Sequence, residues 1–350
     1  MAAYTTIDDP SAFFKCQLYT GNGSANHAIT FDDTDTDMQP DLVWIKNRDA
    51  TDSHCLFDSV RGATKLLVVD TNAAEVTDTD TLDSFASDGF QVDADVKVNT
   101  NTEKYASWNW KAGTTSGITT DGNTTITPSA YSFDQTHGFS IIKYTGNATS
   151  GAKVAHGLGA TPGLIILKDI DSVAGFPVFH KRMNASATPW THHAMLHDIA
   201  TYSTSTAYWN DTAPDSVNFT LGNNTDTNKA STFIGYCWVE KQGYSKFGVY
   251  EGNDNADGTF VYCGFRPAYI CIKNLDQTEA WFAYDTKRMV SNHTRYTLKP
   301  SEPDVEQSGT AHELLDILSN GFKLRYNTAG TNDVNTHIFF AFAESPFVNS

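Results

Sequence analysis

The run Pro40-Asp-Leu-Val-Trp-Ile-Lys46 returns twice along this chain, as Pro162-Gly-Leu-Ile-Ile-Leu-Lys168 and as Pro267-Ala-Tyr-Ile-Cys-Ile-Lys273. In each copy a lysine follows a proline by six positions, and mostly apolar residues lie between them. A short apolar run of this length is typical of a core strand. The sequence therefore predicts one structural unit that is used three times.

Further motifs recur around this run in a constant order. A turn of the form Tyr-x-Gly-Asn stands before each copy and begins at Tyr19, Tyr144 and Tyr250. Each unit closes on two aromatic residues two positions apart, which places both on one face of a strand. We expect these pairs to lie in the core, whereas exposed pairs would form a platform for stacking sugars. The pairs are Trp108 with Trp110, Tyr236 with Trp238, and Phe340 with Phe342.

The spacing of the motifs sets the boundaries of the units. The tyrosine turns lie 125 and 106 residues apart (144 − 19 and 250 − 144), so each unit is long enough to bury a core of its own. The residues between the first two units are rich in Thr, Gly and Asn. We expect a first unit in residues 1–113, a polar linker or hairpin in residues 114–137, a second unit in residues 138–243 and a third in residues 244–350.

Composition and turn chemistry favour strands over helices. The chain contains 15 Tyr, 21 Phe and 7 Trp, whose flat side chains pack well on a pleated sheet, and its hydrophobic content of 40% excludes disorder as the main state. Short apolar runs alternate with Gly, Asn, Asp and Pro turns. The best helical spacing covers residues 312–318, with leucines at 314, 315 and 318. We therefore predict an all-β fold of three tandem β-sandwich-like units with little helix.

The charge balance narrows the classes of partner. The chain has 24 Lys and Arg against 41 Asp and Glu, a formal net charge of −17, so we expect no binding of nucleic acid. No stretch reaches the ~20 apolar residues of a membrane span, and residues 1–10 lack the basic and apolar regions of a secretory signal. The five cysteines are odd in number and lack CxxC spacing, which indicates reduced side chains in a protein that folds in a cytosol.

Two loops carry acidic side chains of the kind that bind calcium. Residues 32–37 do not make an EF-hand, because Met38 and Trp44 occupy the positions that need glycine and glutamate. Residues 253–258 have the composition of a cation loop, but Asn, Asp and Gly are also ordinary turn residues. We predict no calcium site.

A group of three histidines, His192, His193 and His197, has a spacing that would place two of them together on a helix. Zinc binding would need that helix and a third ligand. Pro189 indicates a loop or turn at this point, and no Glu follows His193 as in the HExxH pattern. We interpret the group as packed or surface histidines and predict no metal ligand.

An Asp–Arg pair with a spacing of three follows the run in two units, as Asp58 with Arg61 and as Asp285 with Arg288. We interpret each as a local, exposed ion pair that ties a turn to the sheet and contributes at most about 1 kcal/mol. The alternative is a grip on a sugar or a carboxylate. The second unit has His180 at the aspartate position. Because polar positions change while the apolar frame is kept, we expect no shared active site.

Sequence motifs of catalysis are missing: there is no G-x-S-x-G, no P-loop and no GxGxxG before a helix. A pair of glycosidase carboxylates is defined by spatial separation, so counting carboxylates does not test it. We predict a protein that is not an enzyme, with no catalytic, cofactor-binding or metal-binding residue and no cofactor. We assign no receptor-binding residue from the sequence.

One ordered set of motifs carries a resemblance to a known family. The motifs are Tyr19-Thr-Gly-Asn22, Gln39-Pro-Asp-Leu-Val-Trp-Ile-Lys-Asn-Arg-Asp49, Asp58-Ser-Val-Arg-Gly62, Ser87-Asp-Gly-Phe90, Ser107-Trp-Asn-Trp-Lys-Ala112 and Gly138-Phe-Ser-Ile-Ile-Lys-Tyr-Thr-Gly-Asn147. Together they resemble a repeat family of virion proteins from tailed bacteriophages, in particular marine phages that infect cyanobacteria. The resemblance covers nearly the whole chain, but it is looser in the third unit, which lacks counterparts of Trp44 and Arg48.

The resemblance implies a structural protein of the virion: a surface appendage such as a tail fibre, a tail-associated protein or a head knob, involved in assembly or host attachment. It implies other virion proteins as partners, a homo-oligomer with a trimer as the expected state, and folding in the host cytoplasm. The chain lacks the heptads and collagen-like repeats of a long shaft, which favours a compact appendage. Two alternatives stay open: a carbohydrate-binding module that recognises a host surface glycan, and an enzyme that degrades polysaccharide.

Overall fold

The fold is described from a computed structural model, which covers residues 4–31, 36–289, 291–309 and 315–346 of the chain. These residues form antiparallel β-sheets connected by turns and a few short helical segments, which confirms the predicted all-β class. Within the described residues, no helix has the length and apolar character needed to cross a membrane.

Each unit is a sandwich of a large and a small sheet. In spatial order, the large sheet of the first unit contains β1 (Phe14–Thr20), β9 (Lys104–Trp110), β3 (Leu42–Asn47), β4 (Cys55–Asp58), β5 (Lys65–Val68) and β6 (Val76–Thr77). That of the second contains β10 (Ala130–Asp134), β11 (Phe139–Thr145), β18 (Thr232–Trp238), β13 (Leu164–Asp169), β14 (Pro177–His180), β15 (His192–Met195) and β16 (Ser203–Thr204). That of the third contains β19 (Ser245–Glu251), β25 (Thr336–Pro346), β21 (Phe265–Asn274) and β22 (Trp281–Asp285).

The small sheets cover the outer faces of the large ones. In unit order they contain β2 (His27–Thr30), β8 (Gly89–Val92) and β7 (Leu82–Ala86); β12 (Ala152–Ala155) and β17 (Asn218–Leu221); and β20 (Phe260–Tyr262), β24 (Gly321–Leu324) and β23 (Leu315–Leu318). The helical segments are α1 (Val96–Asn99), α2 (Thr206–Trp209) and the 3₁₀ turns η1 (Pro10–Ala12), η2 (Met183–Ala185) and η3 (Pro189–Thr191).

The proline-to-lysine runs form equivalent strands within the large sheets. They are β3, β13 and β21, and each pairs on one side with the strand that carries the closing aromatics (β9, β18 or β25). On the other side each pairs with β4, β14 or β22. The first closing aromatic lies opposite the same position of every run: Trp44 with Trp108, Ile166 with Tyr236, and Cys271 with Phe340.

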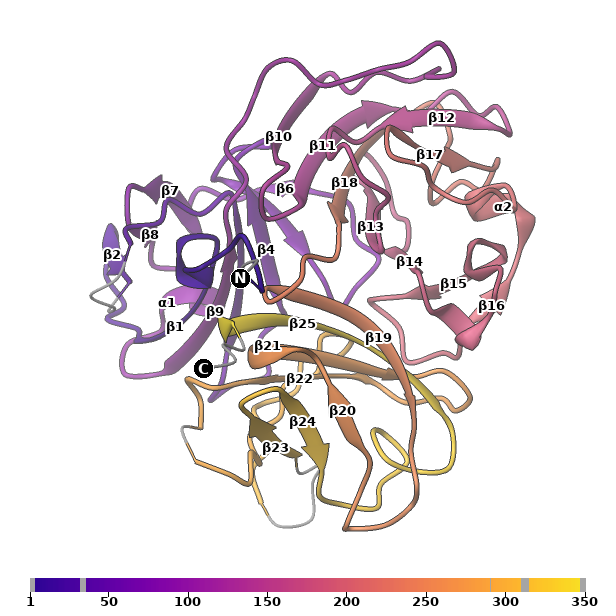
Figure 1. The fold of residues 1–350 in the computed structure, drawn as a ribbon. Coiled ribbons are helices and arrows are strands. Elements are labelled where there is room, and N and C mark those ends of the chain that lie inside the picture. Colours follow the sequence, from indigo (N-terminus) through magenta and orange to yellow (C-terminus); the bar gives the residue numbers. More distant parts are fainter. Residues whose placement is uncertain (1–3, 32–35, 290, 310–314, 347–350) are drawn as a thin grey trace.

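The three large sheets lie around a common centre (Figure 1), and their inward side chains join into one apolar cluster, the central core. At its middle the last aromatic of each closing pair meets its two counterparts. The ring centroids of Trp110 and Trp238 are 6.2 Å apart, those of Trp110 and Phe342 5.4 Å, and those of Trp238 and Phe342 6.4 Å. The three units therefore form one body, because every unit contributes to this shared core.

The opposite face of each large sheet packs against the small sheet of its own unit. On β3, Leu42 and Trp44 point into the central core, whereas Val43 and Ile45 point towards the small sheet. The equivalent strands of the other units alternate in the same way. A strand that is buried on both faces has no polar side to display, so its sequence is a continuous apolar run. This double burial explains why the run was the clearest repeated signal.

The segment 114–137 is partly built into the second unit. Ala130–Asp134 form β10, which pairs with β11 at the edge of the second large sheet. Thr114 pairs with Phe133, so the chain between them makes an excursion and returns. The second sheet therefore begins inside the segment expected to be a polar linker or hairpin.

The apolar spacing of residues 312–318 favours a helix, and this prediction is wrong for the part of the segment that the structure describes. Leu315–Leu318 form β23, which pairs with β24, and residues 312–314 lie outside the described residues. Leu315 and Ile317 are buried in the core of the third unit, as strand alternation requires. Two turns of apolar spacing are too short to stabilise a helix against a pairing strand.

Candidate functional site

The lysines that end the three runs are buried structural groups. Lys46, Lys168 and Lys273 have no exposed surface, and burial lowers the pKa of each to about 8. Lys168 donates to the backbone carbonyl of Asn72 in the first unit at 3.1 Å. Lys273 donates to the carbonyl of Ile199 in the second unit at 2.8 Å. Lys46 donates within the first unit, to the carbonyl of Asn47 at 2.6 Å. Two of the three ammonium groups thus tie neighbouring units together, and all three are out of reach of a substrate.

Asp58 and Arg61 lie at the junction of the first and second units. The Asp58 carboxylate accepts a hydrogen bond from the Tyr236 hydroxyl of the second unit at 2.7 Å and from Arg61 Nε at 2.5 Å. Burial raises the pKa of Tyr236 well above its ordinary value, so the phenol keeps its proton and donates. The side chains of Asp58 and Arg61 are 0% and 1% exposed. The predicted exposed ion pair is therefore wrong: the pair is a buried contact between units.

The junction of the third and first units has the same construction. Asp285 accepts from Trp108 Nε1 of the first unit at 3.0 Å and from Arg288 Nε at 2.6 Å. Arg288 also donates to Glu306 at 3.2 Å, and Arg48 of the first unit holds the same carboxylate through two bonds of 2.9 and 2.7 Å. A buried carboxylate, an arginine and an aromatic donor thus recur as a set.

The junction of the second and third units uses His180 in place of the aspartate. Its Nδ1 accepts from the backbone N–H of Arg182 at 3.1 Å, and its Nε2 donates to the carbonyl of Phe339 in the third unit at 3.1 Å. Met183, fully buried, occupies the arginine position. Burial lowers the pKa of His180 to about 3, so the ring is neutral. In the third unit Phe340 stands at the strand position of Trp108 and Tyr236, and its ring has no hydrogen to donate to a carboxylate.

The closing aromatic pairs are core residues, with exposed fractions between 0% and 5%. They contribute to the central core and leave no ring face open to solvent, so the sugar-stacking interpretation does not apply to them. The five cysteines are likewise buried and free of disulfides.

The three histidines do not converge. His192 and His193 follow one another on β15 and so point to opposite faces. The His193 ring stacks on Tyr208 with centroids 3.6 Å apart, and His197 Nδ1 accepts from the backbone N–H of Phe176 at 3.2 Å. Burial lowers the pKa of His193 to about 4. Among the described residues no group of three or more metal-ligating side chains is found.

The two acidic loops differ in how much of them is described. Residues 32–35 lie outside the described residues, so only Thr36 and Asp37 of the stretch 32–37 are placed. Residues 253–258 form a turn that is held by protein groups: the Asn332 carboxamide donates to the Asn255 carbonyl at 2.7 Å, and the Asn253 carboxamide donates to that of Asp257 at 3.2 Å.

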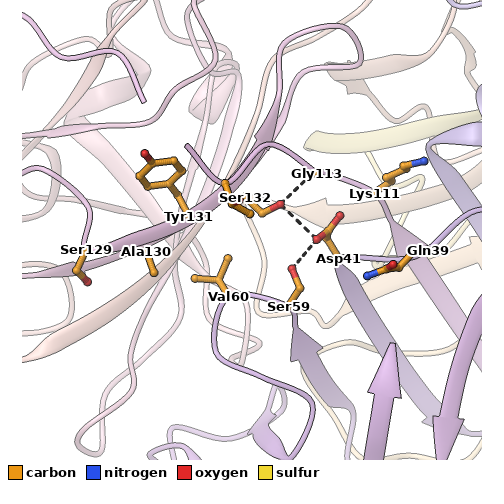
Figure 2. Close-up of a pocket in the computed structure, with 11 residues that line it drawn as sticks. Gln39, Asp41, Ser59, Val60, Lys111, Gly113, Ser129, Ala130, Tyr131 and Ser132 are labelled. Atoms are coloured by element: carbon orange, nitrogen blue, oxygen red, sulfur yellow. Dashed lines mark hydrogen bonds between the residues drawn. The ribbon is translucent and has the colours of Figure 1, made fainter. Parts of the chain in front are cut away.

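A polar pocket of about 660 Å³ opens beside the junction of the first and second units (Figure 2). The first unit contributes residues from the loops before β3, after β4 and after β9, and the second contributes the start of β10. Its lining combines a carboxamide, a carboxylate, an ammonium group, hydroxyls and one aromatic ring. The lining includes Gln39, Asp41, Lys111, Thr115, Ser129 and Tyr131.

Asp41 forms the polar floor of this pocket. It is 8% exposed, and its Oδ1 accepts from the hydroxyls of Ser59 at 2.5 Å and Ser132 at 3.3 Å. Its Oδ2 accepts from the backbone N–H of Ala112 at 2.7 Å. Ser132 belongs to β10, so the floor joins the two units, as the dashed bonds in Figure 2 show. The sequence carried a signal for this residue, because the equivalent positions of the other two runs are Gly163 and Ala268.

A second feature missed in the sequence is a pair of exposed aromatics on β20. Phe260 and Tyr262 are 45% and 53% exposed, on either side of the buried Val261. The first unit has Ala28 and Thr30 at the corresponding places of β2. The sequence carried a signal for this pair. Phe260 and Tyr262 alternate with the apolar Val261, and the equivalent strands of the other two units carry no aromatic residue on their outward face.

The comparisons with known proteins concern the whole three-unit body. Searches of curated proteins and of solved structures each return no match. Residues 9–346 match one family, described as "Domain of unknown function (DUF7483)", and this range runs from η1 to the end of β25. The match spans all three sandwiches together and not one of them alone, and the chain belongs to the DUF7483 family.

Proposed function

We propose that this chain is a non-enzymatic structural protein of bacteriophage particles, part of a surface appendage such as a tail fibre, a tail-associated protein or a head knob. The phage assignment rests on the resemblance of the ordered sequence motifs. The structural role rests on the way in which the fold uses its recurrent polar groups. An appendage bears mechanical load at the particle surface, so a body whose parts are locked together suits the task.

The observation that carries the structural role is the set of polar contacts at the junctions. Asp58 and Asp285 are charged groups that recur between units. Their carboxylates accept hydrogen bonds from Tyr236 and Trp108 of the neighbouring unit. The recurrent lysines bind carbonyls, and two of them reach into the next unit. Because these groups recur at the contacts between units, their repetition suits a body whose three units are held together rigidly.

The particle itself tests the proposal. We expect an antibody raised against the purified chain to label intact, purified phage particles at a fixed position in immunoelectron microscopy, and mass spectrometry of those particles to contain its peptides. A pre-immune serum is the control. Peptides found in the infected cell lysate, with none in purified particles, would contradict the proposal.

Homo-oligomerisation, with a trimer as the expected state, is a further part of the proposal. The chain mass is 38.4 kDa, so light scattering coupled to size exclusion would give about three times that value for a trimer. A single-chain mass at every concentration would contradict the proposed homo-oligomer. The appendage would then contain this chain as a monomer.

A second candidate function is recognition of a host surface glycan, and one observation favours it. The pocket beside the first junction is lined by groups that both donate and accept hydrogen bonds. Retention of the labelled chain on host cells, and its loss after periodate oxidation of their surface sugars, would support attachment through a glycan. Equal retention before and after oxidation would reject it.

A further inference from the structure

We propose that the pocket lined by Gln39, Asp41 and Tyr131 binds a neutral oligosaccharide. This inference rests on the proposed role in attachment and gives it a site and a ligand class. The first step is the comparison of the three junctions at the residue that follows the proline of each run. Asp41 stands there in the first unit, Gly163 in the second and Ala268 in the third.

The fold closes this position at the other junctions. At the second–third junction a Cβ on Gly163 would lie 2.8 Å from the Phe247 ring of the third unit and 3.0 Å from the Lys181 side chain. At the third–first junction Ala268 lines a cavity of only about 170 Å³. The first–second junction keeps about 660 Å³ open. Since the same architecture is stable with the space filled, the open pocket is not a requirement of the fold.

The size and depth of the pocket suit a small ligand. Its volume lies within the range of about 300–1,000 Å³ that is usual for small-molecule sites. Its floor is a buried side chain with two protein-held oxygens: Asp41 keeps its place through Ser59, Ser132 and Ala112. A carboxylate oxygen has about two lone pairs, so this fixed group retains accepting capacity towards a ligand hydroxyl.

The chemistry of the lining selects the ligand class. Asp41 supplies one negative charge and Lys111 one positive charge, so the lining is neutral as a whole. A divalent cation would require several carboxylate ligands, and a polyanion would be repelled by a chain of net charge −17. Sugar hydroxyls both donate and accept, which matches the Gln39 carboxamide and the Ser129 and Thr115 hydroxyls.

Tyr131 gives the pocket an apolar wall. In Figure 2 its ring lies across the pocket from Gln39 and Lys111, with Asp41 between them. The phenol oxygen accepts from the backbone N–H of Ile118 at 3.2 Å, which holds the ring in place. An aromatic ring beside hydrogen-bonding groups fits the two faces of a pyranose, whose C–H groups are apolar and whose hydroxyls are polar.

A glycan array tests the inference with the labelled full-length chain as the probe. We expect binding to neutral oligosaccharides and none to purely anionic ones. Gln39→Ala removes one donor–acceptor group and should weaken the Kd of the best neutral ligand about tenfold, measured by calorimetry. Thr115→Trp should abolish binding by filling the pocket. Both residues are exposed, so the thermal midpoint should stay unchanged and report that the variants are folded.

The third unit supplies a matched control. The double variant Phe260→Ala, Tyr262→Thr installs the residues that the first unit carries at the same strand positions, and it should bind with an unchanged Kd. Loss of binding in this variant, with full binding in Gln39→Ala and Thr115→Trp, would place the ligand on β20 and overturn the pocket. An array without a neutral ligand would overturn it as well. Detection on particles is independent of these outcomes and decides the appendage role separately.

Discussion

The junction of the first and second units and the junction of the second and third units solve one problem with different chemistry. In the first, Asp58 accepts from Tyr236 and pairs with Arg61. In the second, His180 donates to the backbone carbonyl of Phe339 in the third unit. Both arrangements are fully buried and both cap the turn that follows the strand.

A change at a polar position between units is therefore not always neutral drift. A buried carboxylate is stable only with donors around it, and a neutral imidazole is satisfied by one donor and one acceptor. The identity of the residue on one unit therefore follows what the neighbouring unit offers. Trp108 and Tyr236 donate an N–H or O–H to aspartates, whereas Phe340 at the same strand position has no donor and the histidine bonds the backbone carbonyl of Phe339.

The largest effect is expected from splitting an ion pair. Arg288→Met leaves the Asp285 carboxylate buried without its cation, and we expect a loss of about 3–5 kcal/mol in the free energy of unfolding, measured in urea. The double variant Asp285→His, Arg288→Met places the residue types of His180 and Met183 at this junction. Its neutral ring has one acceptor, which either the turn N–H or Trp108 Nε1 can use. We expect the double variant to regain part of the loss, because the buried charge is gone. A double variant as unstable as the single one would contradict the proposed equivalence of the junctions.

The histidine junction should respond to acid. The folded-state pKa of His180 is about 3, against an ordinary value near 6.5, so the unfolded chain binds the extra proton first. Stability is therefore full above pH 6.5 and falls as the pH drops towards 3. We expect this group to account for up to about 3 kcal/mol between pH 6.5 and pH 4. His180→Gln should reduce the pH dependence of the urea midpoint in this window, with the remainder due to other buried histidines such as His193, and an unchanged slope would show that the imidazole is not buried neutral.

The aromatic donor should contribute less than the ion pair. Tyr236→Phe leaves one acceptor of Asp58 without its hydroxyl, and we expect a loss of about 1–3 kcal/mol. Tyr244→Phe is the matched control, because the buried Tyr244 hydroxyl has no hydrogen-bond partner among the described residues. It should be close to neutral in the same denaturation assay. Equal losses in the two variants would mean that the Tyr236–Asp58 bond contributes nothing specific.

The smallest effect is expected at the rim of the third–first junction. Arg48→Ile installs the residue that the second unit has at the same position, Ile170, and removes the two bonds to Glu306. Because Glu306 keeps Arg288, we expect a loss of about 1 kcal/mol or less. A loss comparable to that of Arg288→Met would show that the rim pair is as important as the buried one.

The sequence was sufficient for the three core strands and the all-β class, because apolar runs and turn residues are local signals, but it favoured a helix where β23 lies. It did not reveal that Leu42 and Trp44 face another unit while Val43 and Ile45 face their own, since both faces are apolar. For the same reason the Asp58–Arg61 pair was placed at the surface: spacing shows that two charges are neighbours and does not show what covers them.

The pocket could not be predicted from the sequence, because its residues come together only in the tertiary structure. Asp41 and Ser132 are 91 residues apart in sequence and meet only because β10 joins the edge of the second sheet beside the first unit. The histidine group shows the opposite case, in which residues close in sequence are separated by strand alternation on β15. A comparison of equivalent positions within the chain would have singled out Asp41, because repetition makes the exceptional residue visible.

The shared aromatic centre can be completed only near the end of protein synthesis. Trp110 and Trp238 leave the ribosome well before Phe342, which follows Trp238 by 104 residues (342 − 238). Until that last ring arrives, the inward faces of two finished sheets have no cover, and exposed apolar surface of this kind promotes aggregation. A nascent chain halted before its third unit would therefore need shelter from a chaperone, whereas the finished chain would not.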